Sequence, residues 1–492
     1  MMRPDTDHAL LTEASAQFDR SEYEACARLC DEGLARCASD PSLYYMRGRC
    51  RQLLRRLDDA LKDYTAAIAL EPAYDDAYYH AGSILIEQAQ YRRALEMLYA
   101  LLQRAPGRSD AWALLGGALS KVGEHDHAID CCTQALKLDA NNTAALYNLS
   151  FAHAAKEEPE EALSRIDEAL ALDPGMPMFH LQRASVLLRQ GAFYAGWREW
   201  EWRLEKNDFR ALNVRSAEPG RWKGEPLDGR TILVWCEQGL GDTLQCVRFL
   251  PALKARGARV LFECQKELIP VLRTVQGADL VFERFRVCPE PYDFHIPVMS
   301  LPLELGLMPE SIPFSEGYID ARAMRPFASQ LPVKDGAISV GLAWEGSRLN
   351  PANHHRSGTP MMFAPLFGIP GCRFYSLQHE VPPEGLPSSI RHLGIRSMEQ
   401  LAGAIARMDL VVTIDTSVAH LAGAMGKPVL LLLSALPDWR WQLERETTPW
   451  YASMRILRQR SLGAWMPLTI EASEHVRRRF ERTTKSIELI TH

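Results

Sequence analysis

Residues 408–433, MDLVVTIDTSVAHLAGAMGKPVLLLL, decide the fold of the region in which they lie. Their first apolar run predicts a buried strand that ends at Asp415. Thr416 and Ser417 then open a helix that stops at Gly426, before a second apolar run of strand character. A strand, a helix and another strand in this order indicate a parallel α/β sheet with the helix packed on one face.

The start of this helix has the chemistry of an anion site. The first N–H groups of a helix have no partner inside it, and the hydroxyls of Thr416 and Ser417 stand beside them in the sequence. The helix dipole favours a negative charge there by about 0.3–1 kcal/mol, and by more where the charge is partly buried. A diphosphate would fit such a site.

A similar strand is predicted upstream at residues 337–344, after the turn-forming stretch LPVKDG. The polar loop behind this strand contains four basic side chains, Arg348, His354, His355 and Arg356. Two adjacent histidines in a loop are more often exposed or substrate-binding than metal ligands. Arginine suits phosphate, because its planar guanidinium presents a fork of N–H donors.

A strand, a turn with glycines and a helix are also predicted further towards the N-terminus. The strand covers Thr231–Cys236, and an amphipathic helix is expected from Leu244 to about residue 256. Gly239 and Gly241 permit a tight turn and close approach by a ligand. Asp242 stands at the carboxyl end of the strand, where it fits a helix cap, which is favoured when the residue is taken alone, or a ligand-facing group.

Further strands at 259–264 and 278–282, with helical residues 266–275 between them, continue the alternation of a parallel sheet. The Pro-rich stretch 288–313 is expected to form irregular connections that border a cleft. Two similar α/β halves would then face each other across that cleft.

The first two hundred residues or so repeat with a period of 34 residues. Three columns of small or turn-forming residues recur at that spacing: Ala60, Ala94, Ala128 and Ala162; Gly48, Gly82, Gly116 and Ser150; and Pro72, Pro106, Ala140 and Pro174. They resemble the tetratricopeptide repeat, a helix–turn–helix unit whose small residues let its two helices approach closely. Stacking of such units buries apolar faces that one unit leaves exposed.

An array of this kind offers a concave surface. The predicted inner-face residues are aromatic and mixed in charge: Tyr45, Arg49, Tyr79, Glu87, Lys121, Tyr147 and Phe151. This composition suits a protein or peptide better than nucleic acid. The last, degenerate unit contains Trp197, Trp200 and Trp202, which fit either a sugar-stacking platform or a cap on the next domain. The helical spacing of Trp197 and Trp200 favours the cap.

The α/β motifs resemble the heptosyltransferase-type GT-B glycosyltransferases. The resemblance covers about residues 229–465 and is carried by Gly239–Gln245, Gly341–Trp344 and, above all, residues 415–429. Bacterial proteins that join tetratricopeptide repeats to such a catalytic half, flagellin glycosyltransferases among them, are the nearest likeness.

The resemblance implies an inverting, metal-independent transfer from a nucleotide-activated sugar, with this donor as co-substrate and no other cofactor. It makes Asp242 the general base and Arg356 the residue that offsets charge on the leaving group. The donor phosphates would be held at Asp415, Thr416, Ser417, Val418, Ala419 and His420. Trp344 and Trp439 are assigned to the nucleotide pocket. His420 and Trp439 also fit purely structural roles, the first at the helix start and the second against a neighbouring domain.

The predicted fold class is therefore α plus α/β, in several domains. A solenoid of tetratricopeptide repeats, about six units with the degenerate caps, occupies residues 1–205. A linker at 206–228 leads to a GT-B half made of two Rossmann-like domains, an acceptor-side domain at 229–335 and a nucleotide-sugar-binding domain at 336–492.

Composition narrows the class of partner. The chain has 492 residues, 47% of them hydrophobic and 24% charged, and a net charge of -6, which argues against nucleic acid as the main partner. We expect no export signal, no transmembrane segment and a cytoplasmic location. The 11 cysteines are expected to be free thiols and not a disulfide framework.

Three functions remain open from the sequence. The first is a glycosyltransferase whose repeats hold a protein acceptor, and thus an enzyme of protein glycosylation. The second is a transferase of cell-surface glycan or lipopolysaccharide assembly whose repeats bind a partner. The third is a catalytically inactive scaffold, against which the intact Asp242, Arg356 and Asp415 argue.

Overall fold

The computed structural model describes residues 6–206, 219–320, 337–347, 353–379, 386–443 and 445–490. The chain divides into two compact units, residues 1–182 and 183–492. We call them the first and second units and describe each by itself. The division between the units falls before residue 205, where the sequence places the end of the solenoid.

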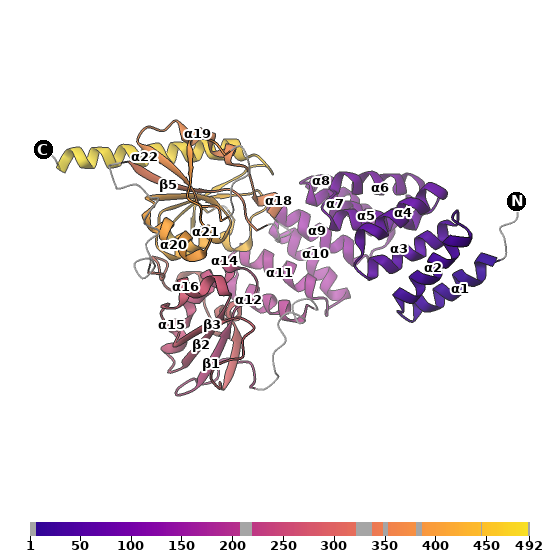
Figure 1. Ribbon diagram of the computed structural model, residues 1–492, viewed down its shortest axis with the longest axis horizontal. Helices are drawn as coiled ribbons and strands as arrows, with labels where there is room; N and C mark the ends of the chain where they lie inside the picture. The colour runs from indigo at the N-terminus through magenta and orange to yellow at the C-terminus, as the bar shows by residue number, and fades with distance from the viewer. Residues whose placement is uncertain are drawn as a thin grey trace. The chain divides into compact units, whose positions relative to one another are not determined.

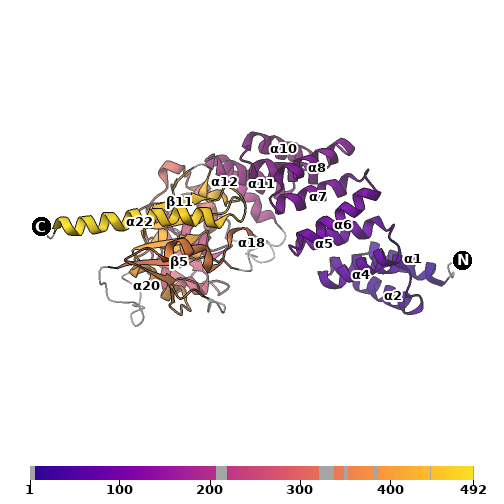
Figure 2. The same ribbon diagram turned by 90° about the horizontal axis from the view of Figure 1, so that it is seen from above.

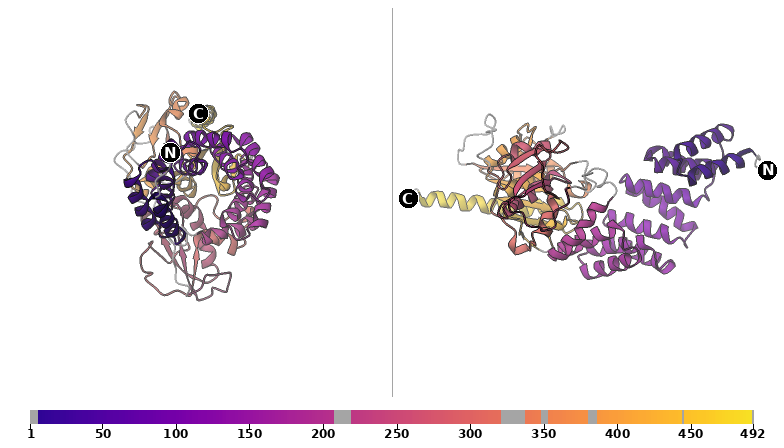
Figure 3. Two further views of the ribbon diagram at one scale, coloured as in Figure 1. Left: turned by 90° about the vertical axis from the view of Figure 1, so that its right-hand side faces the viewer. Right: turned by 90° about the horizontal axis from the view of Figure 1, so that it is seen from below.

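The first unit consists of paired helices in the part of the chain that the structure describes (Figure 2). They are α1 (Thr6–Asp19), α2 (Tyr23–Arg36), α3 (Pro41–Leu53), α4 (Leu57–Leu70), α5 (Asp75–Glu87), α6 (Tyr91–Arg104), α7 (Ser109–Lys121), α8 (His125–Leu138), α9 (Thr143–Ala155), α10 (Pro159–Leu172) and the first part of α11 (Pro177–Arg189). Seen end on, the helices of this unit follow an arc (Figure 3, left). The predicted repeat of helix pairs is confirmed.

The small residues of the repeat lie where two helices touch. Ala60, Ala94, Ala128 and Ala162 are fully buried. A Cβ atom placed on Gly116 would lie 2.3 Å from the sulfur of Cys132, and one on Gly48 would lie 2.8 Å from the Tyr64 ring. The period of 34 residues therefore records close helix contacts that larger side chains would prevent.

The second unit begins within α11 and includes α12 (Phe193–Trp200) and the 3-10 helix η1 (Glu201–Glu205). Phe193 and Trp197 are buried in the apolar core that also contains the strands of the α/β region. These helical residues thus belong structurally to the α/β unit, although the sequence pattern assigns them to the repeats.

The first half of the α/β region is a parallel sheet in the order β3-β2-β1-β4 (Figure 1). Its strands are β1 (Thr231–Trp235), β2 (Arg259–Cys264), β3 (Leu280–Glu283) and β4 (Phe294–Pro297). β4 lies inside the Pro-rich stretch that was expected to be irregular, so that expectation is wrong there. The strand is only four residues long and ends in a proline, which hides it from a pattern search.

The helices of this half are shorter than predicted. After β1 the chain forms α14 (Leu240–Cys246), η2 (Val247–Phe249) and α15 (Leu250–Lys254), and not one helix from Leu244. Between β2 and β3 lie η3 (Lys266–Leu268) and α16 (Ile269–Leu272), and β4 is followed by η4 (Val298–Ser300), α17 (Leu301–Glu304) and η5 (Pro309–Ser311). Pro251 and Pro270 explain the first two interruptions, because proline has no N–H to donate to the preceding turn.

The second half is a larger sheet in the order β10-β11-β9-β8-β5-β6-β7, parallel except between β10 and β11. The strands are β5 (Ile338–Ala343), β6 (Cys372–Ser376), β7 (Ile390–His392), β8 (Leu410–Ile414), β9 (Val429–Leu433), β10 (Thr447–Thr448) and β11 (Tyr451–Arg458). The helices are α18 (Asn353–Arg356), η7 (Pro360–Phe363), α19 (Ala364–Phe367), α20 (Met398–Arg407), α21 (Ser417–Ala424), η8 (Trp439–Trp441) and α22 (Trp465–Ile490). The predicted strand, helix and strand of residues 408–433 are β8, α21 and β9.

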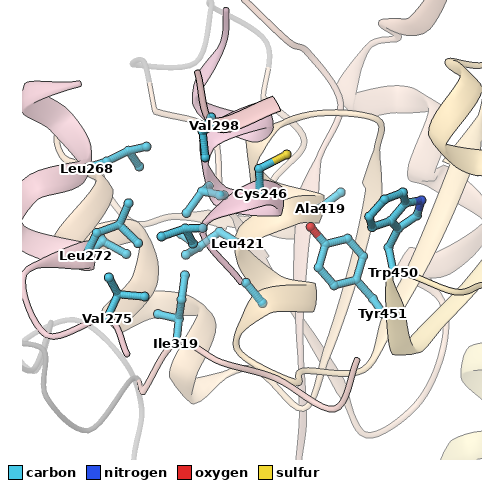
Figure 4. Packing of buried hydrophobic residues seen from close by; sticks show 14 of the residues in the cluster. Cys246, Leu268, Leu272, Val275, Val298, Ile319, Ala419, Leu421, Trp450 and Tyr451 are labelled. Carbon is cyan, nitrogen blue, oxygen red and sulfur yellow. The ribbon is translucent and has the colours of Figure 1, made fainter. Parts of the chain in front are cut away.

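The two halves share one apolar core (Figure 4). Leu268 and Leu272 of the first half lie in the same cluster of buried side chains as Leu421 and Tyr451 of the second. The backbone N–H groups of Tyr318 and Ile319 both donate to the carbonyl of Ala424, at 2.7 and 3.0 Å. The predicted order along the chain, a helical solenoid followed by two α/β halves, is confirmed.

Candidate active site

The strand order of each sheet places a ligand-binding edge. β1 lies between β2 and β4, and β5 lies between β6 and β8. In each sheet, strands that come later in the chain therefore lie on both sides of this strand. In parallel α/β sheets, ligands bind at the carboxyl ends of strands beside such a switch point. Asp242 follows β1, Arg356 follows β5 and Asp415 follows β8. The three main predicted site residues thus follow strands at these two switch points.

Asp242 makes the capping contact that the sequence favoured and a second contact with a residue of the opposite half. Its Oδ2 accepts a hydrogen bond of 2.7 Å from the N–H of Gly239, which is a helix-capping contact at the start of α14. Its Oδ1 accepts a hydrogen bond from Nη2 of Arg440, a residue of the opposite half. The carboxylate is therefore both a cap and one member of an ion pair across the two halves.

Arg440 is a site residue that the sequence analysis missed. Its Nη1 lies 2.7 Å from Oδ1 of Asp438 and its Nε donates to Oε1 of Gln245 at 2.6 Å. Burial alone lowers the pKa of Arg440, but the carboxylates of Asp438 and Asp242 more than offset burial, so the pKa is raised and the side chain is a fixed cation. In the segment 438–441, only Trp439 was named as a site residue from the sequence.

The pKa of Asp415 is raised above the usual value of an aspartate. Burial raises its pKa to about 6, the negative charge of Asp438 adds to the rise, and the positive charges of Arg356 and Arg440 oppose it. The structure therefore brings three aspartates and two arginines into one electrostatic environment. The positive charge of Arg356 acts on the buried Asp415 and lowers its pKa.

His420 is held by contacts within the protein. Its Nδ1 lies 2.9 Å from the hydroxyl of Tyr451, its Nε2 lies 3.9 Å from Oδ1 of Asp415, and its ring stacks on Trp441 with centroids 5.4 Å apart. Burial, with smaller effects from Arg440 and other arginines, lowers its pKa well below the usual value. His420 is thus a neutral imidazole at pH 7 that fixes the first turn of α21, and it brings no positive charge to a phosphate.

The turn that contains Gly239 and Gly241 differs from the one that the sequence predicts. Gly239 has a φ of -88°, and Gly241 has no positive φ either; the residue with a positive φ is Gln238, at 54°. Gly241 is needed for a different reason, because a Cβ on it would lie 2.7 Å from Cδ2 of His420. The close approach at Gly241 is therefore an approach of protein, where the sequence analysis expected a ligand.

Some backbone N–H groups at the start of α21 are paired with Thr416. The hydroxyl of Thr416 accepts a hydrogen bond of 3.3 Å from the N–H of Val418, and the N–H of Ala419 donates to the carbonyl of Thr416 at 3.0 Å. Thr416 is the N-cap of the helix, as the pattern predicts. Ser417 is the first residue of α21, and it is partly exposed.

The two tryptophans assigned to the nucleotide pocket are buried. Trp344 packs in the core of the second half beside Phe363, and its backbone N–H donates to Oε1 of Gln378 at 2.9 Å. Trp439 packs edge-on against Trp197, with ring centroids 5.1 Å apart. The contacts that the structure gives these two rings are packing contacts.

The tryptophans of α12 form a cap. Trp197 is 3% exposed and contacts Phe193, Trp439 and Trp450. Trp200 also meets Trp439, with centroids 5.8 Å apart. The cap interpretation is confirmed, and a sugar-stacking platform at Trp197 is excluded because the ring is covered.

A buried ionic network fixes η1 to the first sheet. Arg203 contacts Glu237 through Nε at 2.7 Å and through Nη2 at 2.8 Å, and its Nη2 also donates to the hydroxyl of Ser300 at 2.7 Å. The backbone N–H of Met299 donates to the same glutamate at 3.1 Å. No signal in the sequence alone pairs Arg203 with Glu237, because they lie on either side of the predicted linker.

The part of the chain that the structure describes contains few groups suited to other site chemistry. Within the described residues there is no group of three or more histidine, cysteine, aspartate or glutamate side chains suited to a metal ion. All 11 cysteines are free thiols. None of the described helices is long and apolar enough to cross a membrane.

Comparison with known families separates two regions. Residues 54–118, 109–142 and 147–195 match tetratricopeptide repeat families. Residues 385–465 match the family described as "Glycosyltransferase family 9 (heptosyltransferase)", which includes β8, α21 and η8. Asp242 and Arg356 lie outside the matched residues.

Individual proteins are similar to all or part of this chain. The chain is 28% identical over 413 residues to Protein FlbA of Caulobacter vibrioides, covering 76% of this chain and 68% of that protein. It is 27% identical over 108 residues to human tetratricopeptide repeat protein 7A, covering 22% of this chain and 13% of that one. Among solved structures, "MamA 41-end from Desulfovibrio magneticus RS-1" is 22% identical with a TM-score of 0.33, covering 36% of this chain and 99% of that one.

Proposed function

We propose that this chain, which joins tetratricopeptide repeats to a glycosyltransferase family 9 domain, transfers a sugar from a nucleotide-activated donor to a protein acceptor held by the repeats. The observation that carries the proposal is a contact between the two halves: Asp242 of α14 pairs with Arg440, whose charge also acts on the buried Asp415 before α21. The proposed base and the proposed anion site thus belong to one charged cluster.

The donor end of the site rests on α21 and Arg356. The N-terminal end of α21 carries the positive end of the helix dipole, with Ser417 partly exposed at its first position. Arg356 supplies a cation whose fork of donors suits a phosphate. Together they would bind the diphosphate of the donor and stabilise the negative charge that grows on it as the sugar leaves.

The base end rests on Asp242. An ionised carboxylate there would take the proton of the acceptor hydroxyl while that oxygen forms the bond to the anomeric carbon. The bond between the anomeric carbon and the diphosphate oxygen breaks with its electron pair on the phosphate. Attack opposite to the leaving group would invert the anomeric centre, and every group in this step is a side chain or a substrate.

The acceptor side of the proposal rests on the first unit. Tyr45 of α3 contacts both Tyr74, in the turn before α5, and His80 of α5, so aromatic side chains join neighbouring repeats. Lys121 lies over the ring of Phe151, 4.6 Å from its centroid, which joins α7 and α9. Aromatic and cationic groups of this kind are those with which proteins bind protein segments.

The experiment is transfer with an acceptor mixture. The full chain is incubated with radiolabelled nucleotide sugars and a bacterial lysate, and the products are separated into protein and lipid-linked oligosaccharide. Label on protein supports the proposal, whereas label only on lipid-linked glycan would replace it with a role in cell-surface glycan assembly. A protein that binds none of the donors and labels nothing would be an inactive scaffold.

A further inference from the structure

One side chain, Arg440, connects the two α/β halves at the proposed base. Its Nη2 donates to Oδ1 of Asp242, which is 198 positions away in the sequence. Its Nε donates to Oε1 of Gln245 at 2.6 Å, and Asp242 and Gln245 are both residues of α14. Nη1 donates to Oδ1 of Asp438 at 2.7 Å, within the loop of Arg440 itself. Nε, Nη1 and Nη2 of Arg440 thus each donate to a different side chain.

Arg440 is itself held in place. Its backbone N–H donates to Oδ1 of Asp438 at 3.1 Å, and its carbonyl accepts a hydrogen bond of 3.0 Å from Nε1 of Trp450. The guanidinium carbon lies 4.4 Å from the centroid of the Trp439 ring. Since the side chain is only 7% exposed, neither water nor salt competes strongly for these contacts.

We propose that Arg440 is a positioning residue, which holds Asp242 in the orientation that accepts the proton of the incoming hydroxyl. This inference rests on the proposed function, because it assigns a task to Arg440 only if Asp242 is the base. A carboxylate has about four lone-pair sites. The bonds to Gly239 and Arg440 use one on each oxygen, so each oxygen retains a site for the substrate.

The geometry requires arginine and not merely a positive charge. The planar fork of arginine meets Asp242, Asp438 and Gln245 at once, whereas a lysine ammonium is a single point on a flexible chain. Arg440→Lys should therefore keep the charge and lose the simultaneous contacts. The kcat of Arg440→Lys is expected to lie between the kcat of wild type and that of Arg440→Gln.

The test is a double-mutant cycle on the full chain. The substrate is the nucleotide sugar that raises the melting temperature most, chosen from UDP-, GDP-, dTDP-, CMP- and ADP-linked sugars. Release of the nucleotide by transfer to water is followed with radiolabelled donor, so the natural acceptor is not needed. Wild type, Asp242→Asn, Arg440→Gln and the double variant are compared at equal folded concentration.

The expected result is a loss of turnover without a loss of donor binding. Arg440→Gln should lower kcat about 10²-fold, the size of effect that a misplaced catalytic group produces, and change the KM for the donor less than about threefold. In the Asp242→Asn background, Arg440→Gln should have no further effect, because the group that it positions is gone.

Two other sets of results would contradict the inference, and they differ in whether the proposed function is also lost. An unchanged kcat in Arg440→Gln, or a reduction that persists in full in the Asp242→Asn background, would overturn the inference and leave the proposed function intact. Normal turnover in Asp242→Asn, or no donor that binds, would overturn the proposed base and the inference with it.

Arg203→Gln is the matched control. Arg203 is also a buried arginine with carboxylate partners in the second unit, Glu237 and Glu201, and it makes no contact with Asp242 among its hydrogen bonds. Its loss should lower the melting temperature in the way that any broken buried ion pair does. The kcat of the folded protein should be that of the wild type, which separates general destabilisation from mispositioning of Asp242.

Discussion

Gly241 and His420 are in contact, and the contact leaves no room for a side chain: a Cβ on Gly241 would lie 2.7 Å from Cδ2 of His420. His420 cannot move away freely, because it bonds to Tyr451 and stacks on Trp441. The start of α14, which carries Asp242, is therefore fixed against the first turn of α21.

Replacing Gly241 by alanine should disturb both stability and turnover. We expect a loss of about 1–3 kcal/mol in the free energy of unfolding, as overpacked cores show, and a lower kcat because α14 must shift. Denaturant unfolding and nucleotide release measure the two effects. Gly368→Ala is the control, since no atom lies within 4 Å of its Cβ position, and it should behave as wild type.

Donor binding should depend on the protonation of Asp415. Its pKa of about 6 is raised by burial and by Asp438, and a bound diphosphate would disfavour the carboxylate further. Binding would then take up a proton, so the Kd of the donor should fall as the pH is lowered from 7.5 towards 5.5. Isothermal titration calorimetry in buffers of different ionisation enthalpy measures the uptake.

Asp415→Asn provides the control for that prediction. The amide resembles the protonated acid, so this variant should bind the donor at pH 7.5 at least as tightly as wild type and take up fewer protons. Weaker binding by Asp415→Asn, or an affinity that rises with pH, would remove Asp415 from this role.

The aromatic cap should stabilise the second unit. Trp197→Ala removes a ring that is 3% exposed, and we expect a loss of about 3–5 kcal/mol in the free energy of unfolding. Tyr194, on the same helix, is 57% exposed, so Tyr194→Ala should change it by about 0.5 kcal/mol at most. Equal effects of the two substitutions on thermal unfolding would show that α12 is not part of that core.

The predicted inner face of the repeats should affect the binding of the acceptor and not the binding of the donor. Lys121→Ala removes the cation that lies over Phe151 and is expected to raise the KM for the labelled protein acceptor several-fold, with the donor KM unchanged. Lys137→Ala, an exposed lysine near the end of α8, is the matched control. A similar acceptor KM in both variants would argue against acceptor binding at Lys121.

The sequence carried enough information to place the edges of the sheets but not the contacts between them. The apolar run before Asp415 and the cap at Thr416 are local patterns, and both lie where they were predicted. The pair of Arg440 with Asp242 is a long-range contact that no periodicity encodes. The strand β4 was missed because it is short, lies in a Pro-rich stretch and itself ends in a proline.

Some residues that the sequence singled out have contacts that it did not predict. Gly241 was expected to permit close approach by a ligand, and in the structure His420 lies close to it. Gly239 and Gly241 were expected to permit a tight turn, and the positive φ of that turn occurs at Gln238. Both differences arise from tertiary packing between the two halves, which a single sequence does not reveal.

The most direct measurement is the rate of nucleotide release by Asp242→Asn beside wild type, with the donor that raises the melting temperature most. The account predicts a fall of about 10²–10⁴-fold in kcat, the usual contribution of a general base, with the melting-temperature shift by the donor preserved. Turnover within a few-fold of wild type, at the same donor occupancy, would contradict it.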